Sequence, residues 1–173
     1  MKYCYECGHK LVDRELKHEG MVPYCENCHA YRFPIFNTAI SMVVLNPDRD
    51  KILLIQQYGK PHNILVAGYV NKGESAEETV IRELKEEIGR DVHAYRFLKS
   101  TYFTPSNTLI FNFAVVVDSD SLEDVSDWEV DHAEWFTFDQ ARTAVKQGSL
   151  AQRFLVNFLQ LYEKDEDFFK EWT

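Results

Sequence analysis

The chain has 173 residues, of which 45% are hydrophobic and 27% are charged, and its formal net charge is −9 at pH 7. This length is sufficient for one sizeable core and a small appended module. The negative charge argues against broad binding to anionic membranes or to a long nucleic acid. No apolar run approaches the roughly 18 residues of a membrane span, and no apolar signal segment begins the chain, so we expect a cytoplasmic protein.

All four cysteines lie near the beginning of the chain. They form two C-x-x-C pairs, Cys4 with Cys7 and Cys25 with Cys28, separated by 17 residues. This spacing is typical of a zinc ribbon, in which four thiolates hold Zn²⁺ tetrahedrally. Two disulfides in a small secreted domain are the alternative, which nothing else in the sequence favours. Because four thiolates leave no open coordination position, the predicted zinc is structural.

Residues 1–34 are therefore predicted to form a zinc ribbon, and residues 35–173 a main domain. Three histidines of the ribbon, His9, His18 and His29, are alternative ligands, but the thiolate set is already complete. The five basic and five acidic residues of the ribbon balance, which weakens a role in nucleic-acid binding.

The main domain begins with a strand pattern. Residues 39–45 and 51–57 are apolar runs rich in β-branched residues, and the turn sequence at 46–50 between them predicts a hairpin. Residues 64–67 form another short strand, which leads to Gly68. Further segments are predicted as strands at 92–103, 109–117 and 134–138, and as an acidic loop at 118–127.

The first predicted helix starts at a capping box made by Ser75 and Glu78, and it runs to about Ile88 before Gly89 ends it. Its apolar residues recur at helical spacing and are expected to face a core: Val80, Ile81, Leu84 and Ile88.

This helix also carries Glu83, Glu86 and Glu87 at positions i, i+3 and i+4, so that their side chains converge. A solvated acidic face is one interpretation. The other is a site of oxygen ligands for Mg²⁺ or Mn²⁺, because such a cation would offset the repulsion between the carboxylates. Arg82 lies one turn from Glu86 and can hold a carboxylate in place.

Two further helices complete the domain. Asp139 is expected to cap a helix that extends to about Gln147, and Ser149 to cap the last one. The acidic tail 163–173 contains aromatic residues, and the sequence does not decide whether they dock. Together the elements predict an α+β domain with a mixed sheet and helices on its faces.

The run from Gly68 to Gly89 resembles the signature of the Nudix hydrolases, G-x5-E-x7-R-E-U-x-E-E-x-G-U, where U is aliphatic. Only Arg90 departs from it, at an aliphatic position that supports packing where the helix ends. The resemblance implies an α/β/α sandwich and metal-dependent attack of water on a nucleoside diphosphate linked to another group. The matching residues are Gly68, Glu74, Arg82, Glu83, Leu84, Glu86, Glu87 and Gly89.

On this resemblance, the three clustered glutamates are the expected ligands of the catalytic Mg²⁺ or Mn²⁺. Arg82 and Glu74 are expected to hold the loop and the helix in register, although by spacing alone Glu74 could also be a ligand. The backbone N–H groups of the loop at 68–73 could contact phosphate.

The run 129–136 is similar to the E-[IV]-x-x-A-x-W-[FY] run found in many Nudix proteins before the last strand. There the first glutamate is an additional metal ligand or a base, which makes Glu129 the candidate here. A plain loop acid in an acidic stretch is the alternative.

A four-cysteine ribbon ahead of such a domain resembles the NADH pyrophosphatase subfamily. That resemblance implies that Tyr69 stacks on a substrate ring and that the backbone at Ala151 contacts the base. The subfamily's S-Q-P-W-P-F-P-x-S run is not kept in residues 100–108, although Tyr102 and Phe103 could still stack on a base. NADH, ADP-ribose and an NAD cap on RNA therefore stay open as substrates.

Two functions of different classes are considered. The first is a pyrophosphohydrolase acting on a nucleotide-linked diphosphate such as NAD(H) or ADP-ribose. The second is a non-catalytic module that senses a nucleotide, or binds a protein through the zinc ribbon. The intact carboxylate set favours the first. A homodimer is expected from the resemblance alone, and light scattering would detect it.

Overall fold

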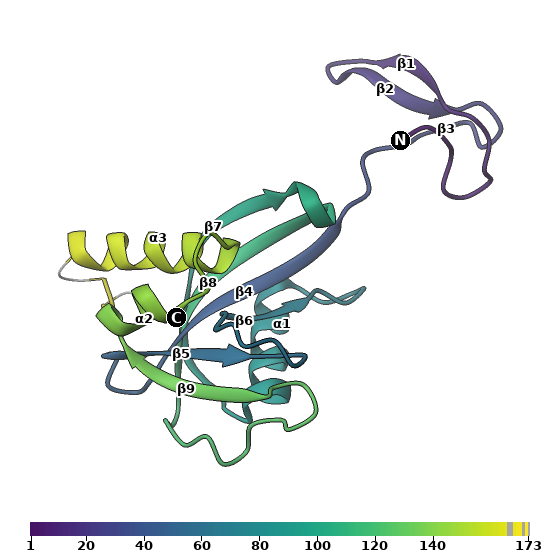
Figure 1. Ribbon diagram of the computed structural model, residues 1–173. Helices are drawn as coiled ribbons and strands as arrows, with labels where there is room; N and C mark the ends of the chain where they lie inside the picture. Colours follow the sequence, from purple (N-terminus) through teal and green to yellow (C-terminus); the bar gives the residue numbers. More distant parts are fainter. Residues whose placement is uncertain (166–167, 171, 173) are drawn as a thin grey trace. The chain divides into compact units, whose positions relative to one another are not determined.

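The protein is described from a computed structural model, which covers residues 1–165, 168–170 and 172 (Figure 1). The chain divides into two compact units, Met1–Phe36 and Asn37–Thr173. The division lies two residues beyond the end of the predicted ribbon. Among the described residues, no helix is both long enough and apolar enough to span a membrane.

The first unit is a small three-stranded antiparallel sheet. Its strands are β1 (Val12–Leu16), β2 (Gly20–Cys25) and β3 (Ala30–Tyr31), in that order across the sheet. Its buried apolar residues are Cys4, Val22 and Cys25. A unit of this size with so small a core needs a cross-link or a metal to be stable.

The second unit is built on a six-stranded sheet in which β7, β8, β4, β5 and β9 are neighbours in that order, and β6 pairs with β4. The β4 and β8 strands run parallel and the other pairs are antiparallel, which confirms the predicted mixed sheet. The strands are β4 (Asn37–Leu45), β5 (Lys51–Gln56), β6 (Val66–Tyr69), β7 (Val92–Phe103), β8 (Thr108–Val117) and β9 (His132–Thr137).

One edge of β4 is shared between two strands. Residues 39–42 of β4 pair with β6, whereas Val44 and Leu45 pair with β5. The β5 and β6 strands therefore diverge where β4 passes from one to the other, and a bridge joins Ile55 of β5 only to Ile64, which lies before β6 begins. Gly68 lies inside β6, and not after a strand ending at residue 67 as predicted.

Helices cover both faces of this sheet (Figure 1). Side chains alternate between the faces along β4, as the pleat of a strand requires. Met42 and Val44 pack with Val80, Leu84 and Ile88 of the first helix. Val43 and Leu45 belong to the opposite core, which includes residues of α2 and α3. This arrangement confirms the expected α/β/α layers.

The first helix begins as predicted. Ser75 Oγ accepts a hydrogen bond from the Glu78 N–H, and the Glu78 carboxylate accepts one from the Ser75 N–H. The helix α1 (Ala76–Glu83) continues as a π-helical segment, η1 (Leu84–Ile88). Gly89 then ends it with φ of 72°. Contrary to prediction, Ile81 does not face the core, because its side chain lies on the solvent side and is half exposed.

The structure corrects the start and the end of the second helix. In α2 (Phe138–Ala144) the N-cap is Thr137, not Asp139, because Thr137 Oγ1 accepts from the Gln140 N–H and the Gln140 side chain bonds back. The helix stops before residue 147, since Val145 is extended and forms a bridge with Asn63.

The last helix, α3 (Leu150–Lys164), is capped by Ser149 as predicted. A short 3-10 turn, η2 (Thr104–Ser106), joins β7 to β8. In the described part of the tail the aromatic residues dock: Phe168 is buried, and the Arg96 guanidinium lies 4.7 Å from the centre of its ring.

Two glycines with the same backbone angle allow the packing behind the first helix to be tested. Gly89 and Gly148 both have φ of +72°, so alanine at either position costs about 1–2 kcal/mol of backbone strain. A Cβ at Gly89 would also lie 2.6 Å from the Asp124 carbonyl oxygen, whereas a Cβ at Gly148 meets nothing within 4 Å. We expect Gly89→Ala to lower the urea midpoint of unfolding clearly more than Gly148→Ala. Equal midpoints would contradict the close packing of residue 124 against the helix end.

Candidate functional site

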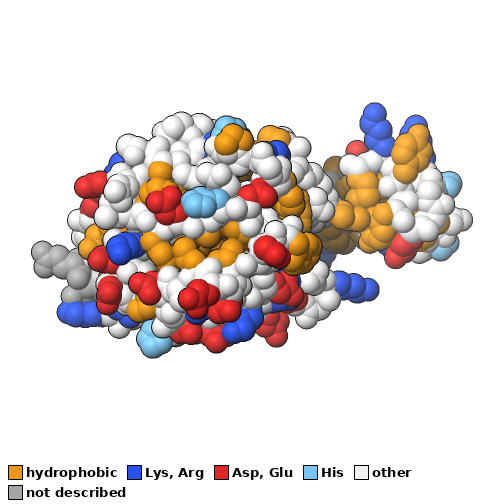
Figure 2. Space-filling model, turned by 60° about the horizontal axis from the view of Figure 1, so that its bottom comes forward, with side chains coloured by type: hydrophobic (Ala, Val, Ile, Leu, Met, Phe, Trp, Pro, Cys, Tyr) orange, Lys and Arg blue, Asp and Glu red, His pale blue; other side chains and the backbone are white. Residues whose placement is uncertain are grey.

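A cavity of about 650 Å³ opens in the second unit, where β5 and β6 diverge. It is lined by residues of β4, β6, α1, β8 and the start of α3, and by the loop before β9. Its size is in the range of ligand-binding sites. On the face of this unit drawn in Figure 2, hydrophobic side chains form a band bordered by acidic ones.

The guanidinium group of Arg82 joins most of the predicted carboxylates. Its Nε lies 2.7 Å from Glu74 Oε1, and its Nη1 lies 2.8 Å from Glu83 Oε1 and 2.9 Å from Glu86 Oε2. Its Nη2 donates to the Tyr69 carbonyl at 3.0 Å and to Glu74 at 3.0 Å. One cation therefore links the helix to strand β6 and to the loop before the helix.

The carboxylate of Glu74 is bonded to protein donors at both oxygens. The ion pair with Arg82 and hydrogen bonds from the Asn71 N–H and the Thr79 hydroxyl lower the pKa of Glu74 to about 2. Because its oxygens are already engaged, the geometry favours a positioning role for Glu74 over the role of a metal ligand.

Glu83 and Glu87 are the buried members of the acidic cluster. Burial raises the pKa of Glu83, although Arg82 opposes the shift. Burial and the nearby Glu83 raise the pKa of Glu87 to about 8, and Glu87 Oε2 has no hydrogen-bond partner among the described residues. Glu86 lies at the edge of the cluster with 56% of its side chain exposed. The cluster holds more negative charge than Arg82 can neutralise.

Strand β6 needs a glycine beside Glu83. A Cβ at Gly68 would lie 2.0 Å from Glu83 Cδ, so any other residue would displace this carboxylate. The glycine thus allows Glu83 to lie directly against the strand. This requirement gives a physical reason for the glycine that begins the signature.

Glu129 lines the same cavity as Glu83 and Glu87, although it is more than 40 residues away in sequence. Its charge contributes to the raised pKa values of both. The loop that carries it is fixed to the helix end, since the Ser126 N–H donates to the Glu87 carbonyl at 2.9 Å. Tertiary structure thus brings a fourth carboxylate to the cluster.

The one residue that departs from the signature also fixes this loop. Arg90 is buried, and its guanidinium pairs with the Asp124 carboxylate. An aliphatic residue could not make that ion pair. The departure therefore replaces apolar packing by an anchor for the loop, which sequence reasoning did not anticipate.

The residues predicted to bind substrate are placed as follows. Tyr69, Phe103 and Ala151 line the cavity together with Gly68. Tyr102 is not among the lining residues, and its hydroxyl donates to Asn107 Oδ1 at 2.6 Å.

Two lining residues, Gln57 and Lys146, were missed by the sequence reasoning. One feature of the sequence could have indicated Gln57, because it is a polar residue at the end of an apolar strand. No feature of the sequence indicated Lys146, since it lies in the turn before α3 and is distant in sequence from the acidic residues of the cavity.

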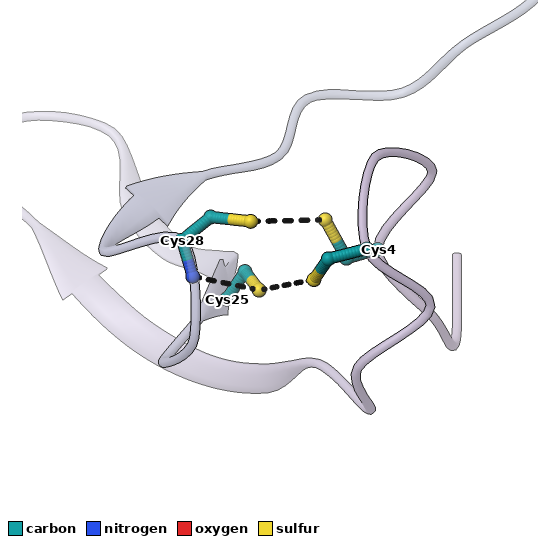
Figure 3. A group of neighbouring side chains, drawn as sticks. Cys4, Cys25 and Cys28 are labelled. Carbon is teal, nitrogen blue, oxygen red and sulfur yellow. Dashed lines mark hydrogen bonds between the residues drawn. The ribbon is translucent and has the colours of Figure 1, made fainter.

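The four cysteines of the first unit form a separate cluster, of which Cys4, Cys25 and Cys28 are labelled in Figure 3. Their Sγ atoms all lie within 4.8 Å of one another, with Cys4 and Cys28 at 3.9 Å and Cys7 and Cys25 at 3.5 Å. Tetrahedral zinc with bonds of about 2.3 Å places its sulfurs about 3.8 Å apart. The spacing suits a metal and is too long for disulfides.

A buried arginine supports the thiolate form in this cluster. Burial would raise the pKa of Cys4, but hydrogen bonds from Arg32 and from the backbone N–H groups of Cys7 and Glu6 bring it down to about 6. The Arg32 Nε lies 3.2 Å from Cys4 Sγ. Among the described residues, no histidine joins the metal-ligating group.

Comparison with known proteins agrees with this geometry. Residues 36–156 match the model of the family described as NUDIX domain. The chain is 36% identical over 118 residues to the NAD-capped RNA hydrolase NudC of Mycobacterium tuberculosis, covering 67% of this chain and 37% of that protein. It is 28% identical over 160 residues to the NudC of Pseudomonas aeruginosa, covering 91% and 55% respectively. The chain thus spans about half or less of the length of these relatives.

Solved structures give the same fold. A NUDIX hydrolase from Nitrosomonas europaea aligns with a TM-score of 0.61 and 21% identity, covering 73% of this chain and 90% of that one. A second structure of a NUDIX hydrolase from that organism aligns with a TM-score of 0.61 and 18% identity, over 95% of this chain and 91% of that one. With the family model matching most of its second unit, the chain belongs to the NUDIX domain family.

Proposed function

We propose that this protein is a metal-dependent pyrophosphohydrolase that cleaves the diphosphate of a nucleotide-linked substrate, such as NAD(H) or ADP-ribose. The observation that carries the proposal is the burial of Glu83 and Glu87 in one cavity, where a single guanidinium neutralises only part of the charge. Carboxylates in such an environment are costly unless a cation joins them. A divalent metal ion is the ligand that this donor set fits.

The residues that would hold Mg²⁺ or Mn²⁺ are Glu83, Glu86 and Glu87, since hard cations prefer carboxylate oxygens. A bound metal would neutralise the diphosphate and lower the pKa of a bound water. Arg82 keeps Glu83 and Glu86 in position, and Glu74 in turn holds Arg82.

Glu129 is the proposed general base. It faces the cavity from a loop and has no part in the Arg82 ion pairs. In the reaction, the oxygen of a water molecule bonds to one phosphorus atom and the bridging P–O bond breaks. The proton of the water passes to Glu129, and the bridging oxygen leaves with the other phosphate. Service as an additional metal ligand is the alternative role.

The cavity can also hold the group attached to the diphosphate. Tyr69 and Phe103 offer rings on which a base or nicotinamide can stack, and Ala151 lies at the start of α3. The two relatives are named for NAD-capped RNA, which supports a nicotinamide-containing substrate. The net charge of −9 disfavours a long RNA as the principal partner.

The first unit is proposed to bind one structural zinc through Cys4, Cys7, Cys25 and Cys28. Reduced thiolates favour a reducing compartment such as the cytoplasm. The homodimer belongs to the same proposal and is supported by resemblance to the ribbon-containing subfamily.

The proposed reaction predicts release of mononucleotides by the purified protein. With Mg²⁺ or Mn²⁺, we expect the protein to hydrolyse at least one member of a panel of NADH, NAD⁺, ADP-ribose and dinucleoside polyphosphates. Chromatography of the products measures this hydrolysis. Chelation with EDTA should abolish the reaction. An inactive protein that still binds a nucleotide in calorimetry would instead support the sensing module.

Substitution of each acidic residue tests its role. We expect Glu83→Gln, Glu86→Gln and Glu87→Gln to lower kcat/KM, and Glu129→Gln to lower kcat by about 10² if it is the base. Glu77→Gln is the matched control, because Glu77 lies exposed on the same helix outside the cavity. Near-normal turnover of the Glu129 variant would remove that residue from the mechanism.

The raised pKa of Glu87 predicts a pH dependence of stability. Without metal, the folded protein keeps this proton up to about pH 8, whereas an unfolded glutamate loses it near 4.5. The folded state therefore binds more protons between these values, and its stability falls as pH rises. Glu87→Gln lacks this loss. As the pH rises through that range, its free energy of unfolding should therefore gain on that of the wild type by up to about 1.4 kcal/mol per pH unit.

Urea unfolding of both proteins in EDTA at pH 5 and pH 8 measures this difference. Glu77→Gln should follow the wild type at both values, since Glu77 is exposed. Added Mg²⁺ should stabilise the wild type most at pH 8. A constant difference between Glu87→Gln and wild type across the range would show that the Glu87 carboxyl is not held protonated by the fold.

A further inference from the structure

The turn after β5 places a tyrosine where the backbone favours glycine or asparagine. Tyr58 and Gly59 have φ of 59° and 64°, and the Lys60 N–H donates to the Gln57 carbonyl. Two successive residues of positive φ closed by this bond are typical of a type I′ turn, in which Asn-Gly is a preferred pair. Gly59 fits this pattern. Tyr58 does not, because a side chain with a Cβ strains this conformation.

Packing within the fold gives no reason for a tyrosine at this position. Tyr58 is 73% exposed, so the fold covers little of its ring. A smaller residue would relieve the backbone without loss of core packing. Among the described residues, five other than glycine have a positive φ, and Tyr58 is the one of them that lines the cavity. Strained residues cluster at functional sites, so the place of this one points to a role in binding.

Asp131 fastens this turn at two points. Its N–H donates to the Gln56 carbonyl at 2.8 Å, and its Oδ2 accepts from the Gly59 N–H at 2.7 Å. Asp131 lies two residues from Glu129, the proposed base. The backbone of Tyr58 is therefore fixed relative to the loop that carries this base. A side chain on a fixed backbone loses less conformational freedom when it binds a ligand.

A second exposed tyrosine has a similar place on the neighbouring strand. The β5 and β6 strands both pair antiparallel with β4, so they run in the same direction. Tyr69 is the last residue of β6, and Tyr58 lies two residues beyond the end of β5. Both tyrosines line the cavity, and Tyr69 is 59% exposed. Two segments that diverge thus each bring an exposed tyrosine to the same cavity.

The chemistry of an exposed ring restricts what it can bind. A diphosphate is charged and strongly hydrated, so it gains little from contact with a tyrosine ring. A nucleobase or a nicotinamide is planar, and such groups stack on aromatic rings with little dependence on their identity. Stacking also removes from water the ring surface that is exposed in the free protein. The ligand that Tyr58 fits is therefore a planar aromatic group.

We propose that Tyr58 is a specificity-determining residue whose ring stacks on a planar group of the substrate, a nucleobase or a nicotinamide, at the opening of the cavity. This inference rests on the proposed hydrolysis and adds a residue to it. Tyr58 takes no part in the bonds that form and break at phosphorus, so it binds the substrate and the transition state equally. Binding of this kind affects KM and leaves kcat unchanged.

The test compares Tyr58→Asn with the wild type, as full-length proteins, on the substrates of the panel that the wild type hydrolyses. Loss of one stacked ring should raise KM about tenfold and change kcat less than about twofold. The urea midpoint should equal or exceed that of the wild type, because asparagine tolerates a positive φ and the lost ring is exposed. A higher KM for NADH and ADP-ribose alike assigns the stacked group to the adenine that they share, and a higher KM for NADH alone assigns it to the nicotinamide.

Two variants serve as controls. Tyr58→Phe keeps the ring and should keep the KM of the wild type. Arg49→Asn makes the same kind of change at a φ of 60° outside this cavity, and its KM should also be normal. An unchanged KM in Tyr58→Asn, an equal rise in Tyr58→Phe, or a lowered urea midpoint in Tyr58→Asn would overturn the inference and leave the proposed hydrolysis intact. A wild-type protein inactive on the whole panel would overturn both, which distinguishes the two failures.

Discussion

The arrangement of the cavity depends on one guanidinium group. Arg82 lies on α1 and binds carboxylates from the preceding loop and from its own helix, together with a backbone carbonyl of β6. These contacts fix the distance between the helix and the strand, and the strand contributes a glycine because Glu83 occupies the space of a side chain. Without this cation, the buried carboxylates would repel one another and the loop would lose its anchor.

The same cation does not neutralise the whole cluster, and this imbalance connects stability with function. Glu83 and Glu87 remain buried with raised pKa values. Each of these groups costs folding free energy in the absence of a ligand. Natural proteins commonly accept such costs where a ligand is bound, because the site must be ready before the ligand arrives.

The divided edge of β4 explains why the groups meet where they do. Because β6 and β5 pair with successive parts of this edge, the two strands diverge, and Gly68 of β6 and Gln57 after β5 both line the cavity. The loop before β9 closes the third side and is tied to both neighbours, through Ser126 to the helix end and through Asp131 to the turn after β5. Three segments distant in sequence thereby form one cavity.

The sequence by itself determined the features that depend on local spacing: the capping box at Ser75, the carboxylates of the helix, the two cysteine pairs and the approximate positions of the strands in the main domain. Tertiary structure decided the rest. Thr137 replaces Asp139 as a cap because the chain leaves β9 already extended, and Ile81 faces solvent because the sheet covers only one side of the helix. The role of Arg90 depends on a partner 34 residues away, which no local pattern encodes, since burial and pairing of polar groups exist only once the chain has folded.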